Sequence, residues 1–107
     1  MKKGIVILAA VSMWILADFR VVSAENEYLS EEIVAYTEEI GEEYGICPEF
    51  IQAIIERESL GDKDANNGYC IGLMQIYQKY HEDRMERLGV SDLYDPYSNI
   101  LVGADYL

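Results

Sequence analysis

Apolar side chains recur three or four positions apart along most of this sequence, and no stretch alternates apolar and polar residues as a surface strand would. Ser30 and Asp95 suit the capping position that precedes a helix, and Gly45 suits the position that follows one. The pattern therefore predicts an all-α fold. The expected helices cover residues 30–45, 48–61, 72–89 and 95–107.

Residues 1–24 have the composition of a secretory signal peptide. Lys2 and Lys3 precede an apolar run at 4–17, and the segment ends with small side chains up to Ala24. A membrane anchor is the alternative, but this run reaches only about 21 Å as a helix, short of the ~30 Å hydrocarbon core. We expect cleavage after residue 24, no stable membrane insertion afterwards, and a secreted or wall-associated domain over 25–107.

The charge of the exported part narrows the range of partners. The whole chain carries a net charge of −12. Removal of residues 1–24 takes away three basic residues and one acidic residue, so the charge becomes −14. Such a surface repels nucleic acids and anionic membranes, and we expect neither as a partner.

Both cysteines, Cys47 and Cys70, belong to the exported part, where the compartment permits a disulfide. A bond between them would contribute about 3 kcal/mol by the chain-entropy argument. The alternative is a pair of free thiols that pack as small apolar groups. The sequence leaves both states open.

Two glutamates lie close together in residues 54–61, which read IIERESLG. Helical spacing places Glu58 on the same face as Ile51 and Ile55, and it places Glu56 on the opposite, polar face. An apolar surrounding and the negative end of the helix dipole would both favour the protonated form of Glu58, as a general acid requires. The alternative is a side chain that extends to water from the edge of the stripe without a catalytic role.

The motifs that follow point to one family. Glu58-Ser59 is followed by a polar, Gly-containing loop, by GLMQ at 72–75 and by LGVSDLYDPYSNILVGADYL at 88–107. In this order and spacing, the segments resemble the catalytic domain of the soluble lytic transglycosylases, over residues 45–107. The resemblance implies a lysozyme-like helical fold that acts on the glycan strands of peptidoglycan.

The resemblance also implies roles for particular residues. Glu58 would protonate the oxygen between N-acetylmuramic acid and N-acetylglucosamine and then act as a base, leaving a 1,6-anhydro end. Ser59 would support the acid. Residues expected in the groove wall or in contact with the glycan are Ser59, Gly72, Leu73, Met74, Gln75 and Tyr106. We expect no cofactor and no metal ion, and we place His81 at the surface or the edge of the groove.

The family has a third motif, an AYN-like stretch downstream of the YL pair, and residues 1–107 do not include it. Its tyrosine orients the acid in the family. We therefore expect the domain to be incomplete at its C-terminal side, and residues 25–107 alone to have weak or no activity.

Three other functions remain open from the sequence. A hydrolytic lysozyme would add a second carboxylate, for which Asp62 and Asp64 are candidates. A peptidoglycan-binding module would lack catalysis altogether. A calcium loop is suggested by Asp62, Asp64 and Asn66, but Asn67 and Leu73 occupy the positions where an EF-hand needs Gly and Glu.

Overall fold

The computed structural model describes residues 29–107, and the predicted signal peptide lies outside them. Within this range the chain folds into four α-helices, one two-stranded hairpin and a short 3-10 helix, which confirms the all-α prediction. No helix among residues 29–107 is long and apolar enough to cross a membrane. The elements in chain order are α2 (Glu31–Tyr44), α3 (Pro48–Ser59), β1 (Cys70–Ile71), β2 (Ile76–Tyr77), η1 (Gln78–Tyr80), α4 (Glu82–Leu88) and α5 (Pro96–Tyr106).

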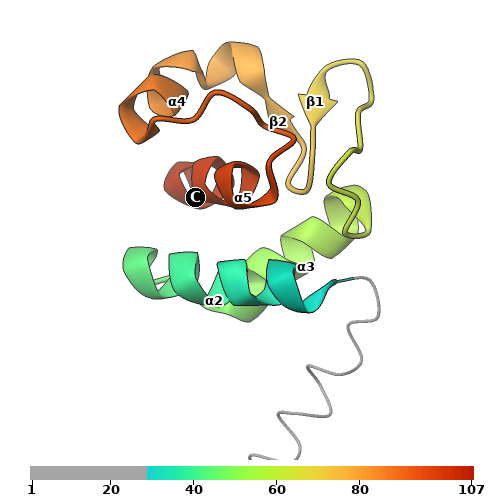
Figure 1. The fold of residues 1–107 in the computed structure, drawn as a ribbon, viewed down its shortest axis with the longest axis vertical. Helices are drawn as coiled ribbons and strands as arrows, with labels where there is room; N and C mark the ends of the chain where they lie inside the picture. Colours follow the sequence, from blue (N-terminus) through green and yellow to red (C-terminus); the bar gives the residue numbers. More distant parts are fainter. Residues whose placement is uncertain (1–28) are drawn as a thin grey trace, which may run out of the picture.

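Helices α2 and α3 pack together at the base of the view in Figure 1. The predicted caps of α2 are confirmed: Ser30 Oγ accepts a hydrogen bond from the Ile33 amide at 3.2 Å, and Gly45 ends the helix at φ +67°. A buried bond joins the two helices, since Gln52 Nε2 donates to Thr37 Oγ1 at 2.9 Å. The outer surface of α2 is acidic.

Helix α5 lies at the centre of the described residues. Figure 1 shows it between α2 and α4, and it also contacts strand β2. Asp95 caps its start by accepting a hydrogen bond from the Ser98 amide at 3.0 Å. The buried apolar core gathers around this helix from α2, α3, β2, α4 and the turns that precede β2 and α5. Its members are Ile33, Ile40, Ile51, Ile55, Leu73, Met74, Ile76, Met85, Leu93, Ile100, Val102 and Ala104.

The predicted helix over 72–89 is wrong in its first half. Residues 72–75 form the turn of the β1–β2 hairpin, in which Cys70 pairs with Tyr77, and helix α4 begins at Glu82. Gly72 (φ +77°) and Gln75 (φ +52°) adopt left-handed backbone angles, which a right-handed helix cannot contain. The amide of Met74 is held by a side chain instead of by a helical carbonyl.

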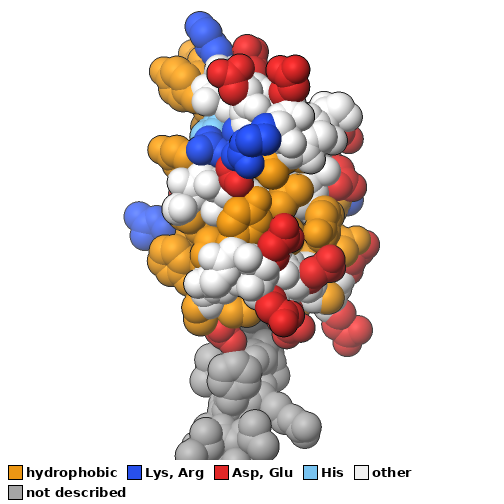
Figure 2. All heavy atoms as spheres, turned by 90° about the vertical axis from the view of Figure 1, so that its left-hand side faces the viewer, with side chains coloured by type: hydrophobic (Ala, Val, Ile, Leu, Met, Phe, Trp, Pro, Cys, Tyr) orange, Lys and Arg blue, Asp and Glu red, His pale blue; other side chains and the backbone are white. Residues whose placement is uncertain are grey.

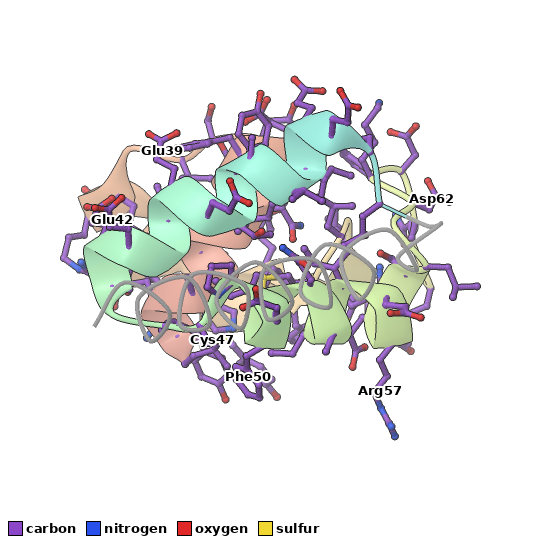
Figure 3. All side chains as sticks on the ribbon, turned by 90° about the horizontal axis from the view of Figure 1, so that it is seen from below. Glu39, Glu42, Cys47, Phe50, Arg57 and Asp62 are labelled. Carbon is purple, nitrogen blue, oxygen red and sulfur yellow. The ribbon has the colours of Figure 1, made fainter. Side chains whose placement is uncertain are left out.

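Both cysteines are free thiols in the structure, so the disulfide considered from the sequence is not formed. Cys47 precedes the first turn of α3, where its thiol donates to Glu49 Oε2 at 2.8 Å. Figure 3 places Cys47 at one end of α3 and Asp62 just beyond the other. Cys70 follows on the Asp62 side, and a helix of this length separates its ends by about 18 Å, far beyond the ~7 Å limit between bonded Cα atoms.

Candidate functional site

The buried face of α3 is rotated relative to the prediction. Its buried residues are Ile51, Gln52 and Ile55, so the face is centred close to Ile55. Glu58 and Glu56 lie on opposite flanks of this face, about 60° and 100° from Ile55. Glu58 is exposed and Glu56 is half-buried. The predicted burial of Glu58 on the apolar stripe is therefore wrong, although the two carboxylates do point to different surroundings.

The hydroxyl of Ser59 attaches the end of α3 to the hairpin turn. Ser59 Oγ lies 2.8 Å from the carbonyl oxygen of Leu73, to which it donates, and 3.1 Å from that of Ile55. The residue next to Glu58 in the chain is thereby fixed against the GLMQ turn. Neither bond involves the Glu58 carboxyl group, and the support of Glu58 by Ser59 stays a prediction.

Asn99 of α5 fastens the hairpin turn from the inside. Its side-chain amide donates to the carbonyl oxygens of Ile71 and Leu93, both at 2.9 Å, and its oxygen accepts from the Met74 amide at 2.8 Å. The residue is buried, and every polar atom of its amide has a partner. Asn99 therefore determines the position of the turn, a role that sequence reasoning did not assign.

Two residues of the GLMQ motif are structural. Leu73 has no exposed surface, so its side chain belongs to the core and cannot contact a glycan. A Cβ on Gly72 would lie 2.3 Å from Asn99 Nδ2 and 2.7 Å from Leu93 O, so this glycine admits Asn99 and Leu93 instead of a sugar. The expectation that Gly72 and Leu73 bind substrate is wrong for that reason.

The other two residues of the motif, Met74 and Gln75, line the surface depressions described below. Met74 is 7% exposed and packs over Gly103, where a Cβ would lie 2.3 Å from the methionine sulfur. Gln75 donates from Nε2 to the carbonyl oxygens of Gly72, at 2.8 Å, and Ala65, at 3.3 Å. These bonds orient the amide and leave Oε1 as its acceptor in a residue that lines both depressions.

Two depressions meet at Glu58. The loop-side depression has a volume of about 380 Å³ and the helix-side depression about 220 Å³, and Glu58 and Gln75 line both. The loop-side depression is also lined by Arg57, Ser59, Leu60, Ala65, Asn66 and Asn67. The helix-side depression is also lined by Ile54, Met74, Ile76, His81, Gly103, Tyr106 and Leu107. A chain-like ligand that fills both would pass over the Glu58 carboxyl group.

A charged cluster lies behind His81 and Tyr106, two residues that line the helix-side depression. Asp105 of α5 accepts from Arg84 Nε at 2.7 Å, from Tyr44 Oη at 2.9 Å and from Arg87. Hydrogen bonds, first from Arg87 and then from Arg84 and Tyr44, lower the pKa of Asp105 from 3.8 to about 2, although burial opposes the shift. Figure 2 shows Lys and Arg side chains gathered beside the histidine on this face.

His81 is buried in the wall of the helix-side depression, not exposed at the surface. Its Nδ1 lies 2.7 Å from Arg84 Nη1, and its ring meets the Tyr106 ring edge-on, with centroids 4.8 Å apart. Tyr106 is 64% exposed and lines the same depression, and its contact with a glycan stays a prediction. The sequence placed His81 at the surface or the edge of the groove, and the structure buries its ring between Arg84 of α4 and Tyr106 of α5.

The loop between α3 and β1 uses its polar side chains for its own folding. Asp62 Oδ1 accepts from the Asp64 amide at 2.9 Å, and Asn66 Oδ1 accepts from the Gly68 amide at 2.7 Å. Asn66 Nδ2 also donates to Tyr94 Oη. Among residues 29–107, no group of three or more His, Cys, Asp or Glu side chains is arranged to hold a metal ion. Figure 3 shows Arg57 pointing away from the body at this end of α3.

We compared the sequence with models of known protein families to identify the family of the chain. A family model described as a transglycosylase SLT domain matches residues 35–107. The match covers most of helix α2 and all later elements, including Glu58, the GLMQ turn and α5. It extends further toward the N-terminus than the motifs alone indicated. By this match, the chain belongs to the transglycosylase SLT domain family of lytic transglycosylases.

Proposed function

We propose that this protein cleaves the β-1,4 bond between N-acetylmuramic acid and N-acetylglucosamine in peptidoglycan and leaves a 1,6-anhydromuramic end. The observation that carries the proposal is the position of Glu58, whose carboxyl group lies where the loop-side and helix-side depressions meet. A glycan strand that occupies both depressions would present the bond between two sugars to this carboxyl group.

The proposed reaction uses Glu58 twice. The protonated carboxyl group donates its proton to the glycosidic oxygen, the bond from C1 of the muramic residue breaks, and N-acetylglucosamine leaves with a new hydroxyl group. The carboxylate then removes the proton from the C6 hydroxyl of the same muramic residue, whose oxygen bonds to C1. Glu58 ends protonated, as it began, and no water is consumed.

The residues around Glu58 favour this route over hydrolysis. Among the described residues that line the two depressions, Glu58 is the only one with a carboxylate side chain. A hydrolytic glycosidase generally requires a second carboxylate about 5 to 9.5 Å from the acid. The candidates from the sequence, Asp62 and Asp64, belong to the folded loop and are not among the lining residues. Internal attack by the C6 hydroxyl requires no second carboxylate.

The exposure of Glu58 is compatible with general acid catalysis. A sugar chain over the carboxyl group would displace water from it, and loss of water favours the protonated form. Met74 would supply an apolar surface for the sugars, Gln75 Oε1 an acceptor, and Tyr106 an exposed ring. We also propose that residues 1–24 export the protein to its peptidoglycan substrate outside the cell.

The proposal is tested by separating binding from cleavage. The whole protein, its Glu58→Gln variant and its Glu56→Gln variant are compared for pelleting with insoluble peptidoglycan and for release of soluble fragments. We expect Glu58→Gln to pellet like the wild type but release fragments at least about 100-fold more slowly, and Glu56→Gln to keep most activity. Pelleting without release by either the wild type or Glu58→Gln would instead indicate a binding module, and equal release by both would contradict the role of Glu58.

A further inference from the structure

His81 is a buried titratable group that the proposed reaction does not use. It is 8% exposed and lines the helix-side depression together with Glu58. The rest of this wall is largely apolar, with Ile54, Met74 and Ile76. A polar ring in such a wall is available for a specific contact with a ligand.

The contact with Arg84 fixes the tautomer of His81. A guanidinium group has donors and no acceptor, so Nδ1, 2.7 Å from Arg84 Nη1, must accept the bond, and the ring proton resides on Nε2. Arg84 is held in turn by Asp105 at 2.7 Å. Burial and then the positive charge of Arg84 lower the pKa of His81, so the ring is neutral at neutral pH.

The remaining nitrogen of the ring has no partner in the described protein. Residues 29–107 provide no hydrogen bond to His81 Nε2, although a buried N–H group that lacks an acceptor costs free energy. The ring that carries this donor lines the depression with apolar side chains and contacts the exposed ring of Tyr106. The surroundings match the acetamido group of an N-acetylated sugar, which combines an acceptor carbonyl with a methyl group.

We propose that the helix-side depression binds the acetamido group of a peptidoglycan sugar, with His81 Nε2 donating a hydrogen bond to its carbonyl oxygen. Arg84 and Asp105 act as positioning residues that keep Nε2 protonated and oriented. The inference rests on the proposed function, because it places a glycan over Glu58. It adds a specific contact from His81, a residue that the proposed reaction does not use.

Nitrogen NMR tests the contact directly, since the chain has a single histidine and its ring signals are unambiguous. The whole protein with Glu58→Gln, which prevents turnover, is titrated with a tetrasaccharide of alternating N-acetylglucosamine and N-acetylmuramic acid. We expect a neutral Nε2–H tautomer in the free protein and a shift of the Nε2–H signal on binding. The de-N-acetylated tetrasaccharide should leave that signal in place. An Nδ1–H tautomer, or equal shifts with both sugars, would overturn the inference.

Substitutions provide a second readout, again in the Glu58→Gln background. His81→Phe keeps a planar ring but removes the donor, and we expect it to bind the acetylated tetrasaccharide about tenfold more weakly. His81→Gln, which places an amide N–H near the same position, should recover most of the affinity. The exposed Asp83 of α4 supplies the control, and Asp83→Asn should bind like the parent.

The outcomes separate the two proposals. If Glu58→Gln in an otherwise unchanged protein still cleaves peptidoglycan, the proposed function fails whatever His81 does. If Glu58 is required but His81→Phe and His81→Gln both keep the parent affinity, the inference about His81 fails alone. Thermal melting shows whether His81→Phe is folded. If it is not, His81→Gln and the NMR titration decide the question.

Discussion

The Ser59 hydroxyl lies 2.8 Å from the carbonyl oxygen of Leu73, and this hydrogen bond joins the helix that carries Glu58 to the turn that carries Met74 and Gln75. The two segments are separated in the chain by a loop, so their relative position depends on contacts of this kind. We predict that Ser59→Ala lowers the stability by about 1 kcal/mol, as expected for one hydrogen bond. It should lower kcat about tenfold with a smaller change in KM, since Glu58 loses its support. A change in KM alone would indicate that Ser59 binds substrate.

Gly72 provides a sharper test of the turn. An added methyl group would lie 2.3 Å from Asn99 Nδ2 at a backbone angle that side chains rarely adopt. We predict that Gly72→Ala lowers the free energy of unfolding by about 3 kcal/mol. Gly89 has nearly the same φ but nothing within 4 Å of the added atom, so Gly89→Ala isolates the backbone effect at about 1 kcal/mol. Equal losses in urea denaturation would show that Asn99 does not restrict residue 72.

Asn99 itself should be among the most sensitive positions outside the apolar core. Asn99→Ala leaves the Met74 amide and the carbonyl oxygens of Ile71 and Leu93 without their partner. We predict a loss of about 3 kcal/mol in the free energy of unfolding, measured by urea denaturation. Asn66, whose amide bonds Tyr94 at the exposed surface, is the matched control, and Asn66→Ala should cost below about 1 kcal/mol. A small effect at both positions would contradict the role assigned to Asn99.

The ion-pair cluster predicts how stability depends on pH. The pKa of Asp105 is lowered in the folded protein from 3.8 to about 2, so its contribution is complete above about pH 4 and is lost as the pH falls toward 2. The contribution amounts to about 2 kcal/mol, since each pKa unit between the folded and the unfolded protein corresponds to about 1.4 kcal/mol. We therefore expect the stability difference between wild type and Asp105→Asn to shrink over this pH range. A constant difference would mean that Asp105 gains nothing from its arginine partners.

Local sequence signals were enough to predict most of the helical framework. Ser30 and Asp95 cap helices as expected, and Pro48 begins α3. Where the chain is held by distant contacts, the prediction failed. Residues 73–77 have helical apolar spacing, but they form a turn and a strand, because Asn99 holds the backbone from another helix. Periodicity reports which residues are buried, and it does not report which backbone buries them.

The candidate site was predicted only in part, because contacts between distant segments also determine which way its side chains face. The sequence identifies Glu58 as distinct from Glu56, but it orients α3 by its isoleucines alone. In the structure Gln52 is buried through its bond to Thr37 of α2, and this rotates Glu58 toward the surface. The position of His81 depends on Tyr106, which belongs to a distant helix, as well as on its neighbour Arg84. Such contacts follow from the packing of elements and have no local signal.

The most direct test of the central claim is mass spectrometry of the fragments released from purified peptidoglycan by the whole protein. We predict fragments that end in 1,6-anhydromuramic acid, and their loss in Glu58→Gln but not in Glu56→Gln. A product with reducing ends would show that water attacks C1, which requires a group that activates water. Anhydro fragments formed equally well by Glu58→Gln would contradict the assignment of Glu58 as the acid and base.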